Sequence, residues 1–208
     1  MVAPDPVPAR RLVLASASPA RLGLLRQAGF DPEVVVSGVD EDAVAAATDV
    51  PVDDLVVRLA SAKADAVVGR RGVAGALVVG CDSLFELDGR SWGKPGSATE
   101  AAARIRAMRG RSGRLWTGHC LVDTGTDRRA AAAAVTTVHF GDMTDAEVDA
   151  YVATGEPFDV AGSFTLDGRA SVFVEGVEGD PSNVIGLSLP LLRRLLSAVG
   201  VDVVTLWR

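Results

Sequence analysis

The stretch from Leu77 to Pro95 reads L-V-V-G-C-D-S-L-F-E-L-D-G-R-S-W-G-K-P, and it organises the rest of the chain. Its first residues form an apolar run that is typical of a short buried strand. The dipeptide Asp88-Gly89 then separates two further runs, which predicts a hairpin with a two-residue turn. The turn predicts three cross-strand pairs: Leu87 with Arg90, Phe85 with Trp92, and Ser83 with Lys94.

This hairpin brings the Lys94 ammonium beside the Asp82 carboxylate, at the exit of the buried strand. Open α/β sheets bind ligands at the ends of their strands, so the pair is a candidate active site. A structural ion pair would leave the same pattern, because ion-pair networks also perturb carboxylates. The pair by itself therefore leaves both interpretations open.

A second candidate site lies near the start of the chain, where Leu12 to Ala15 reads as a strand. Ser18 and Pro19 then predict a helix, since serine is a good N-cap and proline suits the first helical position. Arg21 lies in the first turn, where the helix dipole is positive and a cation is unfavourable unless an anion binds there. With Ser16 in the preceding loop, the segment resembles a phosphate cradle, although it is not a Walker loop. A solvated arginine is the alternative.

The region between these two sites offers one lysine and three carboxylates. Residues 51–68 predict a helix, with Asp49 as its cap, and Lys63 falls in the middle of its apolar face. That lysine either extends its charge to water or projects into a site beside the sheet. The run Asp40-Glu41-Asp42 is either a solvated loop or part of a site for a hard divalent cation, which prefers oxygen ligands.

Composition indicates one globular domain over residues 1–208, with residues 1–10 as a loose arm. The formal charge of -6 argues against a protein that coats nucleic acid. No stretch approaches the ~18 apolar residues of a membrane span. Cys81 and Cys120 lie in apolar runs and read as buried free thiols, so we expect a cytoplasmic protein.

Downstream of the hairpin, strands and helices alternate, which predicts an α/β domain, and the hairpins make its sheet mixed. His119 and His139 lie on strands and have no metal-ligand spacing, so structural roles are favoured. The remaining expected elements are strands at 115–122, 131–140, 171–174 and 201–206, a polar loop at 178–183, and a helix at 187–199.

The chain as a whole resembles the Maf-type nucleoside triphosphate pyrophosphatases, from about Leu12 to Leu196. Each matching segment is weak alone, but their number and order make the resemblance specific. The segments are L-A-S-A-S-P-A-R (14–21), V-D-E (39–41), A-S-A-K-A (60–64), V-G-C-D-S (79–83), G-K-P (93–95), T-G (117–118), Y-V-A-T-G-E-P (151–157), A-G-S-F (161–164) and E-G-D-P-S-N-V-I-G-L (178–187).

The resemblance implies an elongated α/β fold of the Maf/ITPase type, with a mixed sheet flanked by helices, and a homodimer. It implies cleavage of nucleoside triphosphates between the α and β phosphates, yielding a monophosphate and pyrophosphate with a divalent metal, Mg²⁺ or Mn²⁺. The implied role is to remove non-standard or excess nucleotides. A non-catalytic, nucleotide-sensing regulator of septum formation and cell division is the alternative.

The resemblance also implies roles for individual side chains. Asp82 is the proton acceptor, Glu41 is a catalytic acid, and these two are the candidate metal ligands. Activation of water by Asp82 is consistent with general-base catalysis. The remaining implied site residues surround the phosphates: Ser16 and Arg21 as binding residues, and Lys63 and Lys94 as catalytic cations.

Three positions depart from family members that prefer pyrimidines: Ala20 in place of arginine, Ser83 in place of threonine, and Asp167 in place of glutamine. All three bear on base selection in the family, and loss of a bidentate donor at Ala20 changes which base edge is held. The base preference therefore stays open among dTTP or UTP, a methylated GTP and other modified nucleotides.

Overall fold

The computed structural model describes residues 10–47 and 50–208, and these form an α/β fold. The expected arm at residues 1–10, apart from Arg10, and the expected cap Asp49 lie outside the described residues. The strands are β1 Leu12–Leu14, β2 Glu33–Val34, β3 Leu77–Leu87, β4 Arg90–Trp92, β5 Ser112–Asp123, β6 Arg128–Phe140 and β7 Val174–Glu178. The α-helices are α1 Pro19–Gln27, α2 Glu41–Ala46, α3 Val52–Val68, α4 Ala98–Met108, α5 Asp145–Ala153, α6 Pro181–Ile185 and α7 Leu189–Ala198. Short 3-10 helices are η1 Glu156–Asp159, η2 Ala161–Ser163, η3 Arg169–Phe173 and η4 Val203–Leu206.

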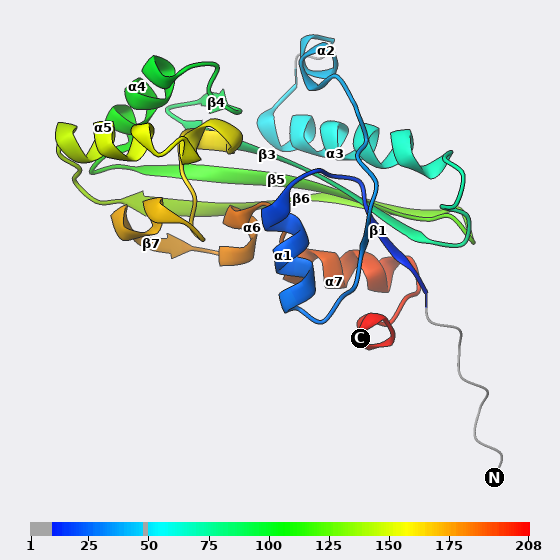
Figure 1. The fold of residues 1–208 in the computed structure, drawn as a ribbon. Coiled ribbons are helices and arrows are strands. Elements are labelled where there is room, and N and C mark those ends of the chain that lie inside the picture. The colour runs from blue at the N-terminus through cyan, green and yellow to red at the C-terminus, as the bar shows by residue number, and fades with distance from the viewer. Residues whose placement is uncertain (1–9, 48–49) are drawn as a thin grey trace.

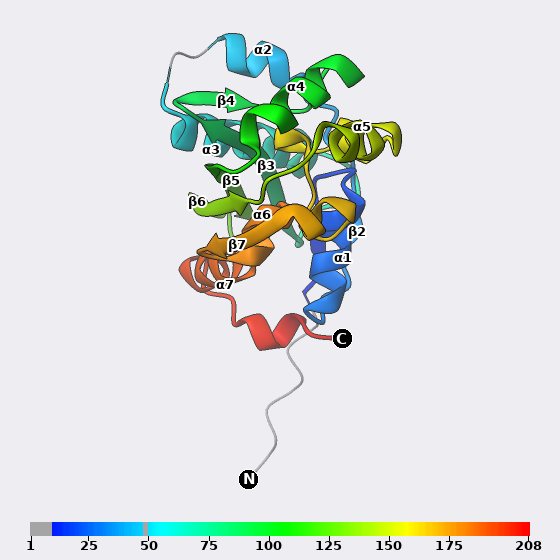
Figure 2. The same ribbon diagram turned by 90° about the vertical axis from the view of Figure 1, so that its left-hand side faces the viewer.

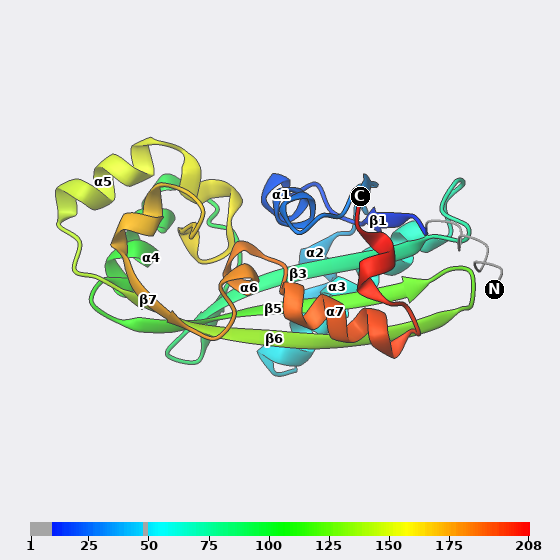
Figure 3. The ribbon, with the colours of Figure 1, turned by 90° about the horizontal axis from the view of Figure 1, so that it is seen from below.

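The strands form one mixed sheet in the order β2-β1-β3-β5-β6-β7, with β4 paired to the far end of β3. Strand β1 runs parallel to β2 and β3, and the other pairs are antiparallel. Strands β3, β5 and β6 run the length of the elongated molecule (Figure 3). The predicted fold class is confirmed.

Strand β3 is longer than the sequence predicts, and this changes the place of Asp82. It spans eleven residues, so Asp82 lies in its middle and not at its exit. Along one edge, β1 pairs only as far as Val79, and β4 begins only at Phe85. Residues 80–84 therefore have no strand on that edge within the described chain, and we call this interruption the sheet gap.

Helices cover both faces of the sheet, with α3 on one face and α1 and α7 on the other (Figures 1 and 2). Helix α3 lies unusually close to β3 and β5. A Cβ added to Gly80 would collide with the Ala60 carbonyl oxygen, and one added to Gly118 would collide with that of Val56. Glycine at these two positions is therefore what permits the close approach.

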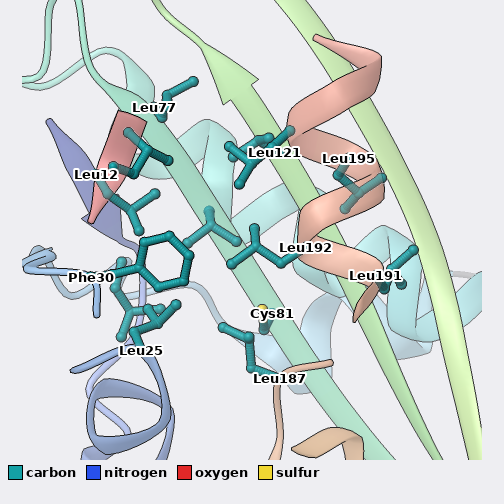
Figure 4. Close-up of a cluster of buried hydrophobic side chains, with 14 of the residues drawn as sticks. Leu12, Leu25, Phe30, Leu77, Cys81, Leu121, Leu187, Leu191, Leu192 and Leu195 are labelled. Atoms are coloured by element: carbon teal, nitrogen blue, oxygen red, sulfur yellow. The ribbon is translucent and has the colours of Figure 1, made fainter. Parts of the chain in front are cut away.

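Three buried apolar clusters stabilise the fold. The first joins α1 and α7 to β1, β3 and β5, and Figure 4 shows Leu191, Leu192 and Leu195 of α7 on the same side of the sheet as Phe30. The second packs the far end of β3, around Phe85, against α4 and α5. The third lies between α3 and the sheet.

Several local predictions were wrong. The expected strand at 171–174 is mostly the 3-10 helix η3, and β7 follows it. The expected strand at 201–206 is also mostly 3-10 helix, η4, and helix α6 begins at Pro181, within the expected polar loop at 178–183. The run 40–42 is a helix start, in which the Asp40 side chain accepts a hydrogen bond from the Ala43 N–H. Both cysteines are buried free thiols, as predicted.

Candidate active site

The sheet gap contains a buried lysine that bridges two carboxylates. Lys63 Nζ lies 2.5 Å from Asp82 Oδ1 and 2.6 Å from Glu41 Oε1. The Lys63 and Asp82 side chains are 8% and 6% exposed, whereas Glu41, at the start of α2, is 51% exposed. The prediction that Lys63 lies on the buried face of its helix is confirmed, because α3 lies close above β3.

The surroundings of Asp82 make it a stronger base than an ordinary aspartate. Burial raises the pKa of the Asp82 carboxyl, and the charge of Glu41 acts in the same direction. The positive charges of Lys63 and Arg21 act in the opposite direction, but burial is the largest effect. A carboxylate whose pKa lies closer to neutrality is better matched to general-base catalysis.

Arg21 approaches the same gap from the other face of the sheet. Its Nε donates to the Gly186 carbonyl (2.7 Å), Nη1 to Ser16 Oγ (3.2 Å) and Nη2 to Ser83 Oγ (3.1 Å). A guanidinium has five N–H groups, so one N–H remains on each terminal nitrogen. No carboxylate forms an ion pair with Arg21 in the described chain. A guanidinium fork with free donors at a helix start capped by Ser18 is able to bind an anion.

The two groups of side chains meet because Asp82 and Ser83 are consecutive in one strand. Successive strand side chains point to opposite faces, so Asp82 meets α3 and Ser83 meets α1. Arg21 lowers the pKa of Asp82 across the strand, which indicates that the two groups share one electrostatic site. A substrate at the gap can therefore contact a carboxylate on one side and a guanidinium on the other.

The expected pairing of Lys94 with Asp82 was wrong. The β3–β4 ladder contains the predicted pairs of Leu87 with Arg90 and Phe85 with Trp92 but goes no further. Beyond it, the Gly93 carbonyl accepts hydrogen bonds from Gly162 N (3.3 Å) and Arg104 Nη1 (2.8 Å), which direct the chain away from β3. Lys94 is exposed, and Asp82 pairs with Lys63 in its place.

Two of the three expected specificity residues lie near the cradle. Ser83 contacts Arg21, and Ala20 is half-buried in the first turn of α1. Asp167 is exposed between η2 and η3, and no hydrogen bond or ion pair in the described chain joins it to the gap. Its role in base selection stays a prediction.

Sequence reasoning missed a buried polar layer beneath the gap. Ser83 Oγ lies 2.9 Å from Thr117 Oγ1, which donates to the Asn183 carbonyl at 3.1 Å. His119 Nε2 accepts a hydrogen bond from Ser188 N (2.8 Å), so the structural role expected for this histidine is confirmed. The available signal was two polar residues, Thr117 and His119, within the apolar stretch of β5 from Leu115 to Val122, because buried polar groups need partners.

Comparisons with known proteins give matches over nearly the whole chain. Residues 11–199 match the family model described as Maf-like protein. The chain is 60% identical over 202 residues to a nucleoside triphosphate pyrophosphatase of Streptomyces coelicolor, covering 97% of each chain. It is 59% identical to a protein of the same name from Streptomyces avermitilis, covering 96% of each. A third such protein, from Salinispora tropica, is 54% identical and is covered over 87% of its length.

Proposed function

Because this chain belongs to the Maf family, we propose that it is a nucleoside triphosphate pyrophosphatase, an enzyme that hydrolyses a phosphoanhydride bond. The observation that carries the proposal is the arrangement at the sheet gap. A buried carboxylate with a raised pKa lies between a lysine and a guanidinium fork. Hydrolysis of a phosphoanhydride needs a proton acceptor for water and cations for the phosphates.

In the proposed reaction, water attacks the α-phosphorus and transfers its proton to the Asp82 carboxylate. The bond from the α-phosphorus to the bridging oxygen breaks, and pyrophosphate leaves with the electron pair. The Arg21 fork binds phosphate oxygens through its two free N–H groups, and Ser16 holds one arm of the fork. Lys63 neutralises charge on the opposite side of the gap.

Enzymes of this family generally depend on a divalent metal, and we propose Mg²⁺ or Mn²⁺. Glu41 and Asp82 fit such a cation, because Lys63 Nζ contacts only Oε1 of Glu41 and Oδ1 of Asp82, which leaves the second oxygen of each carboxylate for a metal. In nucleotide enzymes Mg²⁺ commonly uses one or two carboxylates and completes its shell with phosphates and water. The described residues contain no group of three or more candidate ligands, so the substrate would have to complete the site. The metal would supply Lewis-acid stabilisation of phosphate charge.

The finer properties rest on the family resemblance alone. We propose that the enzyme acts in the cytoplasm as a homodimer, without nucleic acid or membrane partners, and removes non-standard or excess nucleotides. No helix of the described chain is long and apolar enough to cross a membrane. Lys94 is proposed to approach the phosphates only when substrate is bound, because its side chain is exposed. Ala20, Ser83 and Asp167 are proposed to give a base preference unlike that of the pyrimidine-specific members.

The test is pyrophosphate release from a panel of standard and modified nucleoside triphosphates, with Mg²⁺ or Mn²⁺. We expect Asp82→Asn to lower kcat by roughly 100-fold or more, the usual loss on removal of a general base. Asp127→Asn is the matched control. Asp127 is exposed at φ 57°, a conformation that asparagine tolerates, and it should keep full activity.

Full activity in Asp82→Asn would overturn the assignment of the proton acceptor. No pyrophosphate from any triphosphate, with nucleotide binding intact, would instead favour the sensor that regulates cell division. The panel also ranks the bases, which tests whether Ala20, Ser83 and Asp167 define a distinct preference.

A further inference from the structure

The terminal Nη2 of Arg21 is held by a chain of neutral groups that runs into the core. The chain passes from Arg21 Nη2 to Ser83 Oγ (3.1 Å), to Thr117 Oγ1 (2.9 Å) and to the Asn183 carbonyl oxygen (3.1 Å). Thr117 and Asn183 have no exposed surface. The chain therefore connects the anion-binding fork to a part of the fold that solvent does not reach.

The chemistry of the two ends fixes the direction of every hydrogen bond. A guanidinium only donates and a carbonyl only accepts, so Thr117 must donate to Asn183 and Ser83 must accept from Arg21. Thr117 has then used its hydrogen and can only accept from Ser83. Both hydroxyl hydrogens consequently point away from Arg21, which leaves a Ser83 lone pair facing the guanidinium.

The far end of this chain is rigid. Asn183 Nδ2 donates to the Leu115 carbonyl (3.1 Å) and to Thr136 Oγ1 (3.2 Å), and the Asn183 N–H donates to the Asp180 carbonyl (3.2 Å). These bonds tie α6 to β5 and β6, so the Asn183 carbonyl is a fixed acceptor. Because this acceptor is fixed, it sets the donor-to-acceptor direction of the hydrogen bond from Thr117, and through Thr117 that of the hydrogen bond from Ser83.

We propose that Thr117, which touches no substrate, is a positioning residue that orients the Arg21 fork through Ser83. This inference rests on the proposed function, since the fork is proposed to bind substrate phosphates. Without the Thr117 hydroxyl, Ser83 loses the acceptor that fixes its hydroxyl group, and its side chain is free to change rotamer. Nη2 of Arg21 then loses the fixed contact that holds the plane of the guanidinium.

The test uses Thr117→Val, which keeps the shape of the side chain and replaces the hydroxyl with a methyl group. Because the fork binds phosphates before and during the reaction, we expect KM to rise about 10-fold with kcat changed less than about 2-fold. Thr117→Ser restores the hydroxyl and should recover most of the wild-type KM. Thr137→Val on β6 is the control, since the Thr137 side chain makes no hydrogen bond in the described chain and KM should not change.

A double-mutant cycle with Ser83→Ala separates positioning from a general effect on structure. If Thr117 acts through Ser83, the double variant should show no larger KM than Ser83→Ala alone. Independent, multiplying effects would overturn the proposal, and so would a Thr117→Val enzyme with wild-type KM. If the wild-type enzyme releases pyrophosphate but the effects of the two substitutions on KM multiply, the proposed role of Thr117 is refuted and the proposed function stands. If the wild type hydrolyses no triphosphate, the proposed function itself fails.

Discussion

At the scale of single residues, His119 shows how a neutral buried side chain supports a charged site. Its Nε2 accepts from Ser188 N, and its Nδ1 lies 3.1 Å from the Thr117 carbonyl, so the ring holds the turn that follows Gly186. Burial lowers the pKa of His119 from 6.5 to about 4, and the nearby Arg21 cation adds to the effect. A protonated ring could not accept from Ser188.

This pKa predicts a specific dependence of stability on pH. The unfolded chain binds a proton at His119 below pH 6.5 and the folded chain only below about 4, so stability is lost as pH falls through that window. From pH ~7 to ~5 the contribution is about 2 kcal/mol in the free energy of unfolding. Urea unfolding at both pH values measures it.

The control for this prediction is the second histidine. His119→Gln should remove the contribution, so its stability should fall with pH by about 2 kcal/mol less than that of the wild type. His139→Gln, changed at a partly exposed position on β6, should keep the full fall. An unaltered fall in His119→Gln would show that the histidine is not held neutral.

The site residues that could be placed from the sequence depend on local patterns, and those that could not depend on contacts between distant parts of the chain. Lys63 was placed correctly because a helical wheel depends only on local periodicity. Lys94 was misplaced because the hairpin pattern cannot say where the ladder ends, which depends on the distant residues Gly162 and Arg104. Thr117 was missed because its partners lie far away in the sequence, at Ser83 and Asn183.

At the scale of elements, the distance between α3 and the sheet sets the position of Lys63. The backbone of α3 lies directly over Gly80 and Gly118, because neither glycine has a side chain that would separate it from the strands at these two positions. Any residue with a Cβ at these positions must push α3 outward. The lysine would then move away from Asp82, so the site depends on two glycines that carry no functional group.

Gly80→Ala is therefore expected to weaken both fold and function. Overpacking of this kind lowers the free energy of unfolding by about 1–3 kcal/mol, and kcat should fall because Lys63 is displaced. The control is Gly69→Ala at the C-terminal end of α3, where an added Cβ meets no other atom. It should leave the free energy of unfolding and kcat unchanged. Chemical denaturation and pyrophosphate release measure the two effects, and wild-type behaviour of Gly80→Ala would refute the close-packing argument.

The type of an element could be predicted where its periodicity or capping signal was strong. Predictions were wrong for short segments that lacked both signals. The helix at α1 follows from its Ser18 cap and Pro19, and the hairpin from Asp88-Gly89. The segment 201–206 has apolar residues that suit a strand, but the Asp202 side chain accepts from the Val204 N–H and starts a 3-10 turn. Local side-chain bonding of this kind competes with strand pairing.

At the scale of the whole molecule, β3 contributes side chains to all three apolar clusters. Leu77 belongs to the first, Phe85 to the second and Val78 to the third. Strand β5 is shared in the same way. The two ends of the elongated sheet are thus built on the same strands, with the gap between them.

A shared strand makes the two ends thermodynamically inseparable, so we expect one cooperative unfolding transition. Phe85→Leu at one end removes buried atoms and should destabilise both ends by the same amount, roughly 1–2 kcal/mol. The ring centroid of Trp92 lies 5.9 Å from that of Phe85, so the fluorescence of Trp92 reports on that end of the sheet. Trp207 forms an isolated β-bridge with Phe30 and reports on the other end. Variants that retain one tryptophan each should lose fluorescence at the same denaturant concentration, whereas two midpoints would reveal separate folding units. Slow amide hydrogen exchange should likewise extend through the gap at those β3 amides that face β5, because the β3–β5 ladder is continuous there and opens only when the whole sheet unfolds.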